Sequence, residues 1–203
     1  FAESIKVGSN YVSDGLSHIY DFKADGAVTM GAGDSTLRLD GAKEVTFTAK
    51  VAAYLPVEQN EEGKAVQKAN INRPPYWHLE KSRRGETRDV AVELVVNGYP
   101  VASQVITADG SVNDVSFTYA VEHSSWAAIR ILPSSHTNPI FVEVGGKPIR
   151  ASKRSAEWCR AAVDQCWKMK ETAIRDEDKA EAKAAYDVAR EAYDRIIAES
   201  VGE

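Results

Sequence analysis

Apolar and polar residues alternate over short stretches before Arg150, and turn residues separate these stretches. The clearest stretch is residues 44–54, where every second residue is apolar: Val45, Phe47, Ala49, Val51 and Ala53. Alternation with this period gives a strand one buried face and one wetter face, as in antiparallel sheets. We predict eight or nine such strands, at residues 18–22, 35–39, 44–54, 90–97, 99–107, 112–121, 125–132, 140–144 and 147–150.

Turn signals join these strands. Asn97-Gly98 lies between two of them and is typical of a two-residue type I′ hairpin turn, which needs positive φ at both positions. Asp109-Gly110 and Gly145-Gly146 mark two further connections. Short, mostly antiparallel strands with such turns predict a mainly β fold, an antiparallel β-sandwich of immunoglobulin-like or jelly-roll type. The sequence does not choose between these two topologies.

From Ser152 onward the period changes to about 3.6 residues, which predicts helices. The first helix has an apolar face formed by Ala156, Cys159, Val163, Cys166 and Trp167. The second has an apolar face formed by Ala182, Tyr186, Ala189, Tyr193, Ile196 and Ile197. The acidic residues 176–178 suit the N-cap and first turn of the second helix, so we place the break near Ile174-Arg175.

These patterns predict three parts of the chain. Residues 9–150 form the sandwich domain, and residues 151–203 form an antiparallel helical hairpin packed on it. Residues 1–8 are interpreted as the end of a preceding helix, because the chain starts at Phe1 with neither an initiator Met nor a signal-peptide pattern. We therefore expect the chain to be a piece of a longer protein.

Composition places the chain among ordinary globular proteins. Its 203 residues include 43% hydrophobic and 27% charged residues, with a net charge of −5. This charge gives no reason to expect a nucleic-acid partner. No run approaches the roughly 18 apolar residues of a membrane span, so we expect no membrane partner either.

The two cysteines, Cys159 and Cys166, fall on one predicted helix. A separation of about 10 Å along the helix axis puts them beyond disulfide reach. No His or Asp arrangement accompanies them locally. We interpret both as small hydrophobic residues on a buried stripe rather than as metal ligands or catalytic thiols.

A polar corner, Ser134-Ser135-His136-Thr137-Asn138, separates two predicted strands and precedes Pro139. The proline biases Asn138 toward an extended conformation. Side chains of these types usually bond the local backbone, so we interpret the corner as a turn. The alternative is that His136 and Asn138 project toward a substrate or toward another domain.

The segment at residues 55–89 is long, charged and without periodicity, and it carries Tyr76 and Trp77. We interpret it as a sandwich crossover with one aromatic anchor. The alternative is a loop that lines a cleft or a domain contact, where the two aromatic rings stack on a sugar. Residues 83–88 are basic with an interleaved Glu86, and we interpret them as a solvated loop.

Two pieces of the sequence resemble one family. Residues 9–15, SNYVSDG, followed by His18, resemble the segment where the hydrolase domain passes into the C-terminal domain of PHP-type (polymerase and histidinol phosphatase) metallohydrolases of the carbaryl-hydrolase-like CehA/McbA branch. Residues 134–159, SSHTNPIFVEVGGKPIRASKRSAEWC, resemble the far end of the same proteins, as do Asp164-Gln165-Cys166-Trp167, Ala185-Tyr186-Asp187 and Ala189-Arg190. The resemblance covers nearly the whole chain.

The resemblance implies a non-catalytic accessory C-terminal domain of a metal-dependent hydrolase, which braces or borders a catalytic barrel preceding it on the same chain. The chain alone is then not an enzyme. Asp14, otherwise most simply a turn residue, and His18 are expected to line the domain junction. We favour a bacterial periplasmic or secreted location over the cytoplasm. The competing hypotheses are a stand-alone carbohydrate-binding module and a structural exported domain.

The catalytic pattern of that family is missing from this sequence. Its members bind two or three metals through His-x-His pairs, whereas the four histidines here are isolated from one another: His18, His78, His123 and His136. We therefore predict no catalytic residue, no metal ligand and no cofactor in this chain.

Overall fold

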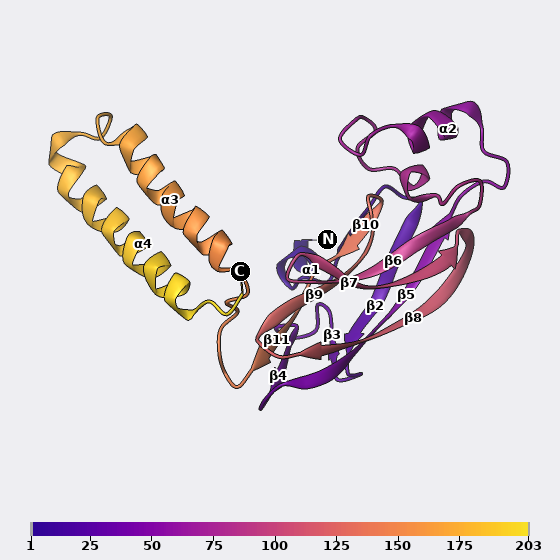
Figure 1. The fold of residues 1–203 in the computed structure, drawn as a ribbon, viewed down its shortest axis with the longest axis horizontal. Helices are drawn as coiled ribbons and strands as arrows, with labels where there is room; N and C mark the ends of the chain where they lie inside the picture. The colour runs from indigo at the N-terminus through magenta and orange to yellow at the C-terminus, as the bar shows by residue number, and fades with distance from the viewer. Residues whose placement is uncertain (1, 203) are drawn as a thin grey trace. The chain divides into compact units, whose positions relative to one another are not determined.

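Two β-sheets pack face to face in the computed structural model, which describes residues 2–202 (Figure 1). They belong to a unit that ends at Lys147, and a second unit starts at Pro148. The larger sheet has seven strands, in the order β1 (Tyr11–Ser13), β10 (Ser135–Thr137), β9 (Ser125–Ile131), β11 (Ile140–Val144) and β4 (Thr36–Leu39), with β6 (Asp89–Val96) and β7 (Tyr99–Thr107) joined through β9. The smaller has four, in the order β3 (Val28–Thr29), β2 (Ser17–Ala24), β5 (Lys43–Tyr54) and β8 (Asp109–Val121).

Alternating residues fill the core between the sheets, as the sequence predicts. In β5, Phe47 and Val51 are fully buried. Phe47 stacks on Phe22 of β2 with ring centroids 6.2 Å apart. Leu94 of β6 and Ile129 of β9 enter the same cluster from the opposite sheet. Among the described strands β4 and β11 pair in parallel and the other pairs are antiparallel, so the predicted antiparallel sandwich is confirmed.

The predicted hairpin turn at Asn97-Gly98 is also confirmed. Asn97 has a φ of 51° and Gly98 a φ of 93°, and the two residues join the antiparallel strands β6 and β7. Positive φ at both central positions is what a type I′ turn requires, and it explains why Asn and Gly stand there.

Three short strands were not predicted: β1, β3 and β10, each of two or three residues. Strands this short carry no readable alternation, and the partner of β1 is β10, which lies more than a hundred residues away in the sequence. The polar corner is therefore not a simple turn, because Ser135–Thr137 is a strand.

The predicted strand at residues 147–150 is wrong. Gly145 and Gly146 both have positive φ and turn the chain after Val144, where β11 ends. The last strand of the sheet therefore ends at Val144, before the predicted strand at residues 147–150.

The segment at residues 55–89 contains two helical elements, contrary to the prediction of an irregular crossover. α2 (Glu61–Lys68) begins after Asn60, whose side chain accepts a hydrogen bond from the N–H of Gly63 at 2.7 Å. A 3₁₀ helix, η1 (Leu79–Ser82), follows later in the segment. Figure 1 shows α2 beyond one end of the sandwich strands. At eight residues α2 is too short for its period to stand out from the charged sequence around it.

The chain approaches the first sheet through a short helix, α1 (Ala2–Lys6). Gly8, with a φ of 72°, follows the helix and turns the chain toward β1. Phe1 lies outside the described residues. That α1 continues a longer helix stays a prediction.

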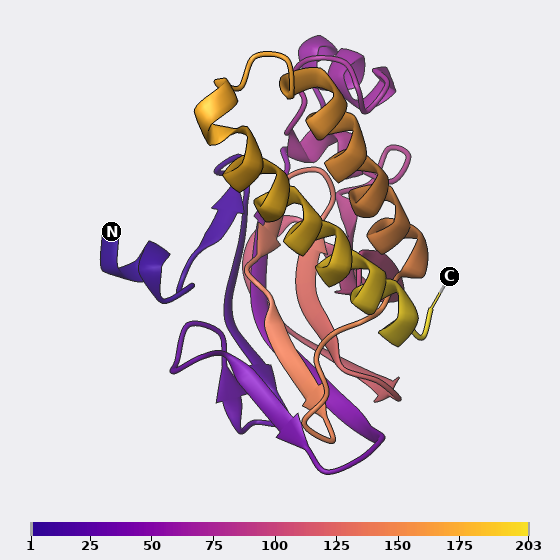
Figure 2. The ribbon, with the colours of Figure 1, turned by 90° about the vertical axis from the view of Figure 1, so that its left-hand side faces the viewer.

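The second unit is the predicted antiparallel hairpin, with its two helices side by side in Figures 1 and 2. α3 (Lys153–Lys170) begins after Ser152, whose hydroxyl accepts a hydrogen bond from the N–H of Ser155 at 3.1 Å. A 3₁₀ turn, η2 (Asp176–Asp178), leads into α4 (Lys179–Glu199), and Asp178 stands at the N-cap without a side-chain capping bond. Packing of the hairpin on the sandwich stays a prediction. None of the helices in residues 2–202 is long and apolar enough to cross a membrane.

Candidate functional site

A cavity of about 590 Å³ lies on the outer face of the seven-stranded sheet, the face turned away from the core. Its volume falls within the range of small-molecule sites. Strands β6, β9, β10 and β11 contribute to it, together with the 55–89 segment, and its lining consists of Trp77, Val95, Gly98, Trp126, Ala128, Arg130, Leu132, Pro133, Ser135, His136, Thr137, Asn138, Pro139 and Phe141.

Alternate side chains of β9 form the floor of this cavity. Ala127, Ile129 and Ile131 point into the core and are at most 1% exposed. Successive side chains of a strand point to opposite faces, so Trp126 and Arg130 stand on the outer face. Phe141 of β11 is the direct cross-strand neighbour of Trp126, and both aromatic residues line the cavity.

Arg130 is held in place by Glu93, its direct cross-strand neighbour on β6. Its Nε donates to Oε2 of Glu93 at 2.6 Å, and both side chains are about three-quarters buried. No described residue accepts a hydrogen bond from the two terminal amino groups of Arg130. The cavity therefore presents hydrogen-bond donors beside a carboxylate.

The polar corner forms one rim of the cavity. The Nδ2 of Asn138 donates to the carbonyl oxygen of Gly8 at 3.1 Å and to Oδ1 of Asn10 at 3.0 Å. The backbone N–H of Asn138 donates to the carbonyl oxygen of Asn10. His136 is exposed, and its Nδ1 lies 3.2 Å from the carbonyl oxygen of Thr137. A carbonyl oxygen can only accept, so Nδ1 is the donor in this contact.

Trp77 also lines the cavity, and it is 72% exposed. The chain just after it is tightly anchored: Leu79 is fully buried in the core, and its N–H donates to Oδ2 of Asp14 at 2.7 Å. The hydroxyl of Ser82 donates to the carbonyl oxygen of Leu132 in the cavity lining. These contacts fix the Trp77 wall over the sheet.

Asp14 also organises a buried cluster of hydroxyl groups beneath the corner. Its Oδ1 accepts from the hydroxyl of Ser134 at 2.6 Å and from the N–H of Leu16 at 2.9 Å. The hydroxyl of Ser17 lies 2.5 Å from that of Ser134 and donates to that of Ser135 at 2.7 Å. This network joins the turn before β2, the polar corner and the start of η1.

Glu80 and Arg83 form a buried ion pair within the 55–89 segment. Arg83 donates through Nε and one terminal amino group to both carboxylate oxygens of Glu80, at 2.7 and 3.0 Å. Arg83 also donates to the carbonyl oxygens of Pro56 and Thr87. Burial alone raises the pKa of Glu80, but hydrogen bonds from Arg83 and Gln59 outweigh it and lower the pKa below its ordinary value. The interpretation of residues 83–88 as a solvated loop is therefore wrong for Arg83, because its partner Glu80 lies one helical turn away and draws it inside.

The structure brings three of the sequence candidates together and leaves three apart. Trp77, His136 and Asn138 line the cavity, whereas Asp14 lies behind its wall in the hydroxyl cluster. Tyr76 is 54% exposed and does not line the cavity.

His18 stands on β2 of the other sheet, with its Nδ1 2.8 Å from the hydroxyl of Tyr11. Sequence reasoning missed Trp126, Arg130 and Phe141. The signal for them was the alternation of the predicted strands, which gives their side chains the face opposite the core.

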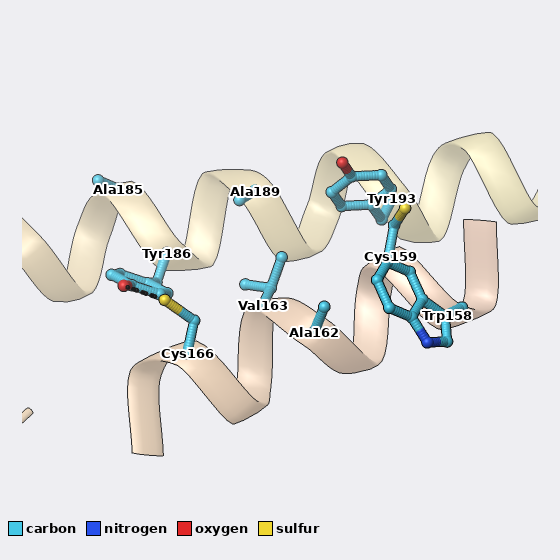
Figure 3. A pocket seen from close by; sticks show the side chains of 9 residues that line it. All are labelled: Trp158, Cys159, Ala162, Val163, Cys166, Ala185, Tyr186, Ala189 and Tyr193. Carbon is cyan, nitrogen blue, oxygen red and sulfur yellow. Dashed lines mark hydrogen bonds between the residues drawn. The ribbon is translucent and has the colours of Figure 1, made fainter. Parts of the chain in front are cut away.

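A second concavity, of about 470 Å³, lies between the helices of the hairpin (Figure 3). Its lining is apolar or small: Trp158, Cys159, Ala162, Val163, Cys166, Ala185, Tyr186, Ala189 and Tyr193. The thiol of Cys166 and the hydroxyl of Tyr186 are 3.2 Å apart, and this hydrogen bond raises the pKa of Tyr186. We refer to this surface as the hairpin groove.

Both cysteines lie on α3 as free thiols, as predicted. They are half-buried rather than buried, because they border the hairpin groove instead of the centre of the helix pair. Ion pairs also join the two helices: Asp164 of α3 accepts from Arg190 of α4 at 2.7 Å, and Arg160 of α3 donates to Asp194 of α4 at 3.0 Å.

No group of three His, Cys, Asp or Glu residues within residues 2–202 is arranged to hold a metal ion. No protein-family model matches the chain, and a search of the curated proteins finds no match. The assignment to the PHP-type metallohydrolases therefore stays a proposal.

Proposed function

We propose that this chain is the non-catalytic accessory domain of a PHP-type metal-dependent hydrolase and that the cavity on its outer face borders the catalytic barrel. The observation that carries this proposal is the attachment of the N-terminal segment to the cavity rim. Asn138 lines the cavity and also bonds Gly8 and Asn10. A domain that precedes residue 1 on the same chain would therefore join at this rim.

The N-terminal segment is firmly seated, which supports a braced domain rather than a loosely tethered one. β1 pairs with β10, so that Val12 stands opposite His136. Gly31, with a φ of 77°, approaches the same segment so closely that a Cβ there would lie 2.4 Å from the Cα of Ser9. Few freely rotating bonds remain between α1 and the sheet, and a preceding domain would inherit that restricted orientation.

Two measurements test the proposal. The first is the reading frame before the codon for Phe1, where we expect a barrel domain with His-x-His metal-ligand pairs. The second compares Asn138→Ala with the control Asn113→Ala in the full-length protein. The side chain of Asn113 on β8 makes only a local hydrogen bond, to the carbonyl oxygen of Ser111.

We expect Asn138→Ala to speed proteolytic cleavage near residues 2–10 and to lower the melting temperature of the barrel, and Asn113→Ala to change neither. A signal peptide directly before Phe1 would reject the proposal. So would an Asn138→Ala protein whose barrel melts and is cleaved like the control.

A further inference from the structure

We infer that the outer-face cavity is a binding site for a neutral saccharide. The inference deepens the proposed function, on which it rests, by naming the ligand class that this accessory domain holds beside its hydrolase. Trp77, Leu132 and Phe141 are 72%, 47% and 41% exposed and face one concavity together with Trp126. Large apolar side chains gathered in one exposed concavity mark a binding surface.

The aromatic rings are arranged for a ligand with flat apolar faces. Trp126 and Phe141 are cross-strand neighbours on one face of the sheet, and Trp77 from the 55–89 segment lines the same cavity. Aromatic rings offer large, rigid contact surfaces whose geometry favours stacking against a flat partner. A pyranose ring has such faces, formed by its C–H groups.

The polar groups of the cavity set the charge of the ligand. Glu93 neutralises the charge of Arg130, whose terminal amino groups still offer donors in the cavity lining, so the site provides hydrogen bonds without a net charge that would select an ion. A purely apolar ligand would cover Arg130 and the ring of His136 without replacing the hydrogen bonds that water makes to them, which is costly. A neutral ligand with several hydroxyl groups meets all three conditions, because each hydroxyl both donates and accepts.

The walls are held before any ligand binds. Asp14 and Ser82 fasten the chain that follows Trp77, and the Glu80–Arg83 pair closes the same segment. A preorganised wall reduces the ordering cost of binding. Asp14 is therefore a positioning residue for this site, although it does not line the cavity.

The test measures binding of maltose, cellobiose and lactose to the chain by calorimetry and by tryptophan fluorescence, with glycerol and glucuronate as comparison ligands. We expect at least one neutral disaccharide to bind saturably with a Kd of about 1 mM or tighter. Glycerol has no ring face, and glucuronate carries a charge that the Arg130–Glu93 pair, neutral as a whole, does not offset, so both should bind more weakly.

Matched variants locate the site. Trp77→Ala and Phe141→Ala should weaken binding at least about tenfold, as expected for an aromatic group at the centre of an interface. Trp158→Ala is the control, because Trp158 is also 72% exposed but borders the hairpin groove, and it should leave the affinity unchanged.

The inference is overturned if none of the three disaccharides binds at about 10 mM, a concentration at which even weak millimolar sites fill. It is also overturned if Trp77→Ala and Trp158→Ala bind with equal affinity. Neither result depends on the reading frame before Phe1, so a failure here leaves the accessory-domain proposal standing, and the failures of the two proposals are distinguishable.

Discussion

The carboxylate of Asp14 accepts a hydrogen bond from the backbone N–H of Leu79, 65 residues further along the chain, at 2.7 Å. Through this one bond, the turn before β2 fixes the start of η1 and with it the wall that carries Trp77. The other oxygen of the same carboxylate accepts from Ser134 in the polar corner. Asp14 therefore joins the two sides of the candidate cavity.

We expect Asp14→Ala to lower the free energy of unfolding by about 2–3 kcal/mol, because it leaves partly buried donors without their acceptor. Asp109→Ala is the control: its carboxylate bonds the nearby Ser111 at an exposed position, so we expect a clearly smaller loss of stability. Urea unfolding measures both. Equal losses for the two variants would show that the long-range bonds of Asp14 add nothing.

Asn138 and His136 differ in the hydrogen bonds that their side chains make. Asn138→Ala removes two side-chain bonds to the N-terminal segment, and we expect it to cost about 1–2 kcal/mol and to speed hydrogen exchange in residues 8–13. His136→Ala should stay within about 0.5 kcal/mol, since its exposed ring bonds only the adjacent carbonyl. Exchange-coupled mass spectrometry separates the two. Faster exchange in the His136→Ala protein, or none in the Asn138→Ala protein, would contradict this.

The Glu80–Arg83 pair should make stability depend on acid. The pKa of Glu80 is lowered from 4.5 in the folded state, so its contribution is fully present above the unfolded-state pKa and is lost as pH falls through the folded-state pKa. We expect the free energy of unfolding to decline as the pH drops below about 4.5. Glu80→Gln should flatten part of this decline. Glu122→Gln, at an exposed position after β8, should leave its slope unchanged.

Replacing Arg83 instead of Glu80 tests whether the ion pair is buried. Arg83→Met leaves the Glu80 carboxylate without its partner in a buried place, and we expect a loss of about 3–5 kcal/mol at neutral pH. The double variant Glu80→Gln, Arg83→Met removes the stranded charge, so we expect it to recover part of that loss. A double variant no more stable than Arg83→Met would rule out the unpaired charge as the cause. Thermal and urea unfolding report both.

Two tryptophans of α3 provide a matched test of the hairpin. Trp167 packs edge-on against Tyr186 of α4 with ring centroids 5.1 Å apart, whereas Trp158 is 72% exposed. We expect Trp167→Ala to destabilise the helix pair by about 2–3 kcal/mol and Trp158→Ala to change it by less than about 0.5 kcal/mol. Circular dichroism of the helical signal during heating follows the unit directly. The reverse order of the two variants would show that the helices pair through another face.

Local pattern was sufficient to predict the long strands and the helices of the hairpin. Alternation at Phe47 and Val51 marks one face of β5 for burial, and positive φ at Asn97 and Gly98 follows from the residue types alone. These features depend on neighbours in the sequence, since strand period, helix period and turn chemistry are local properties. Short elements such as β10 and α2 were missed, because two to eight residues carry too little periodicity to be recognised.

The sequence by itself determined that this protein is a β-sandwich followed by a helical hairpin, and that Trp77, His136 and Asn138 were worth considering as binding residues. Tertiary structure alone decided that these three share one cavity with Trp126 and Arg130. It alone decided that Arg83 is buried and that Asp14 reaches Leu79. The physical reason is that strand pairing and buried hydrogen bonds join residues far apart in sequence, and no local pattern records which distant partner a residue will find.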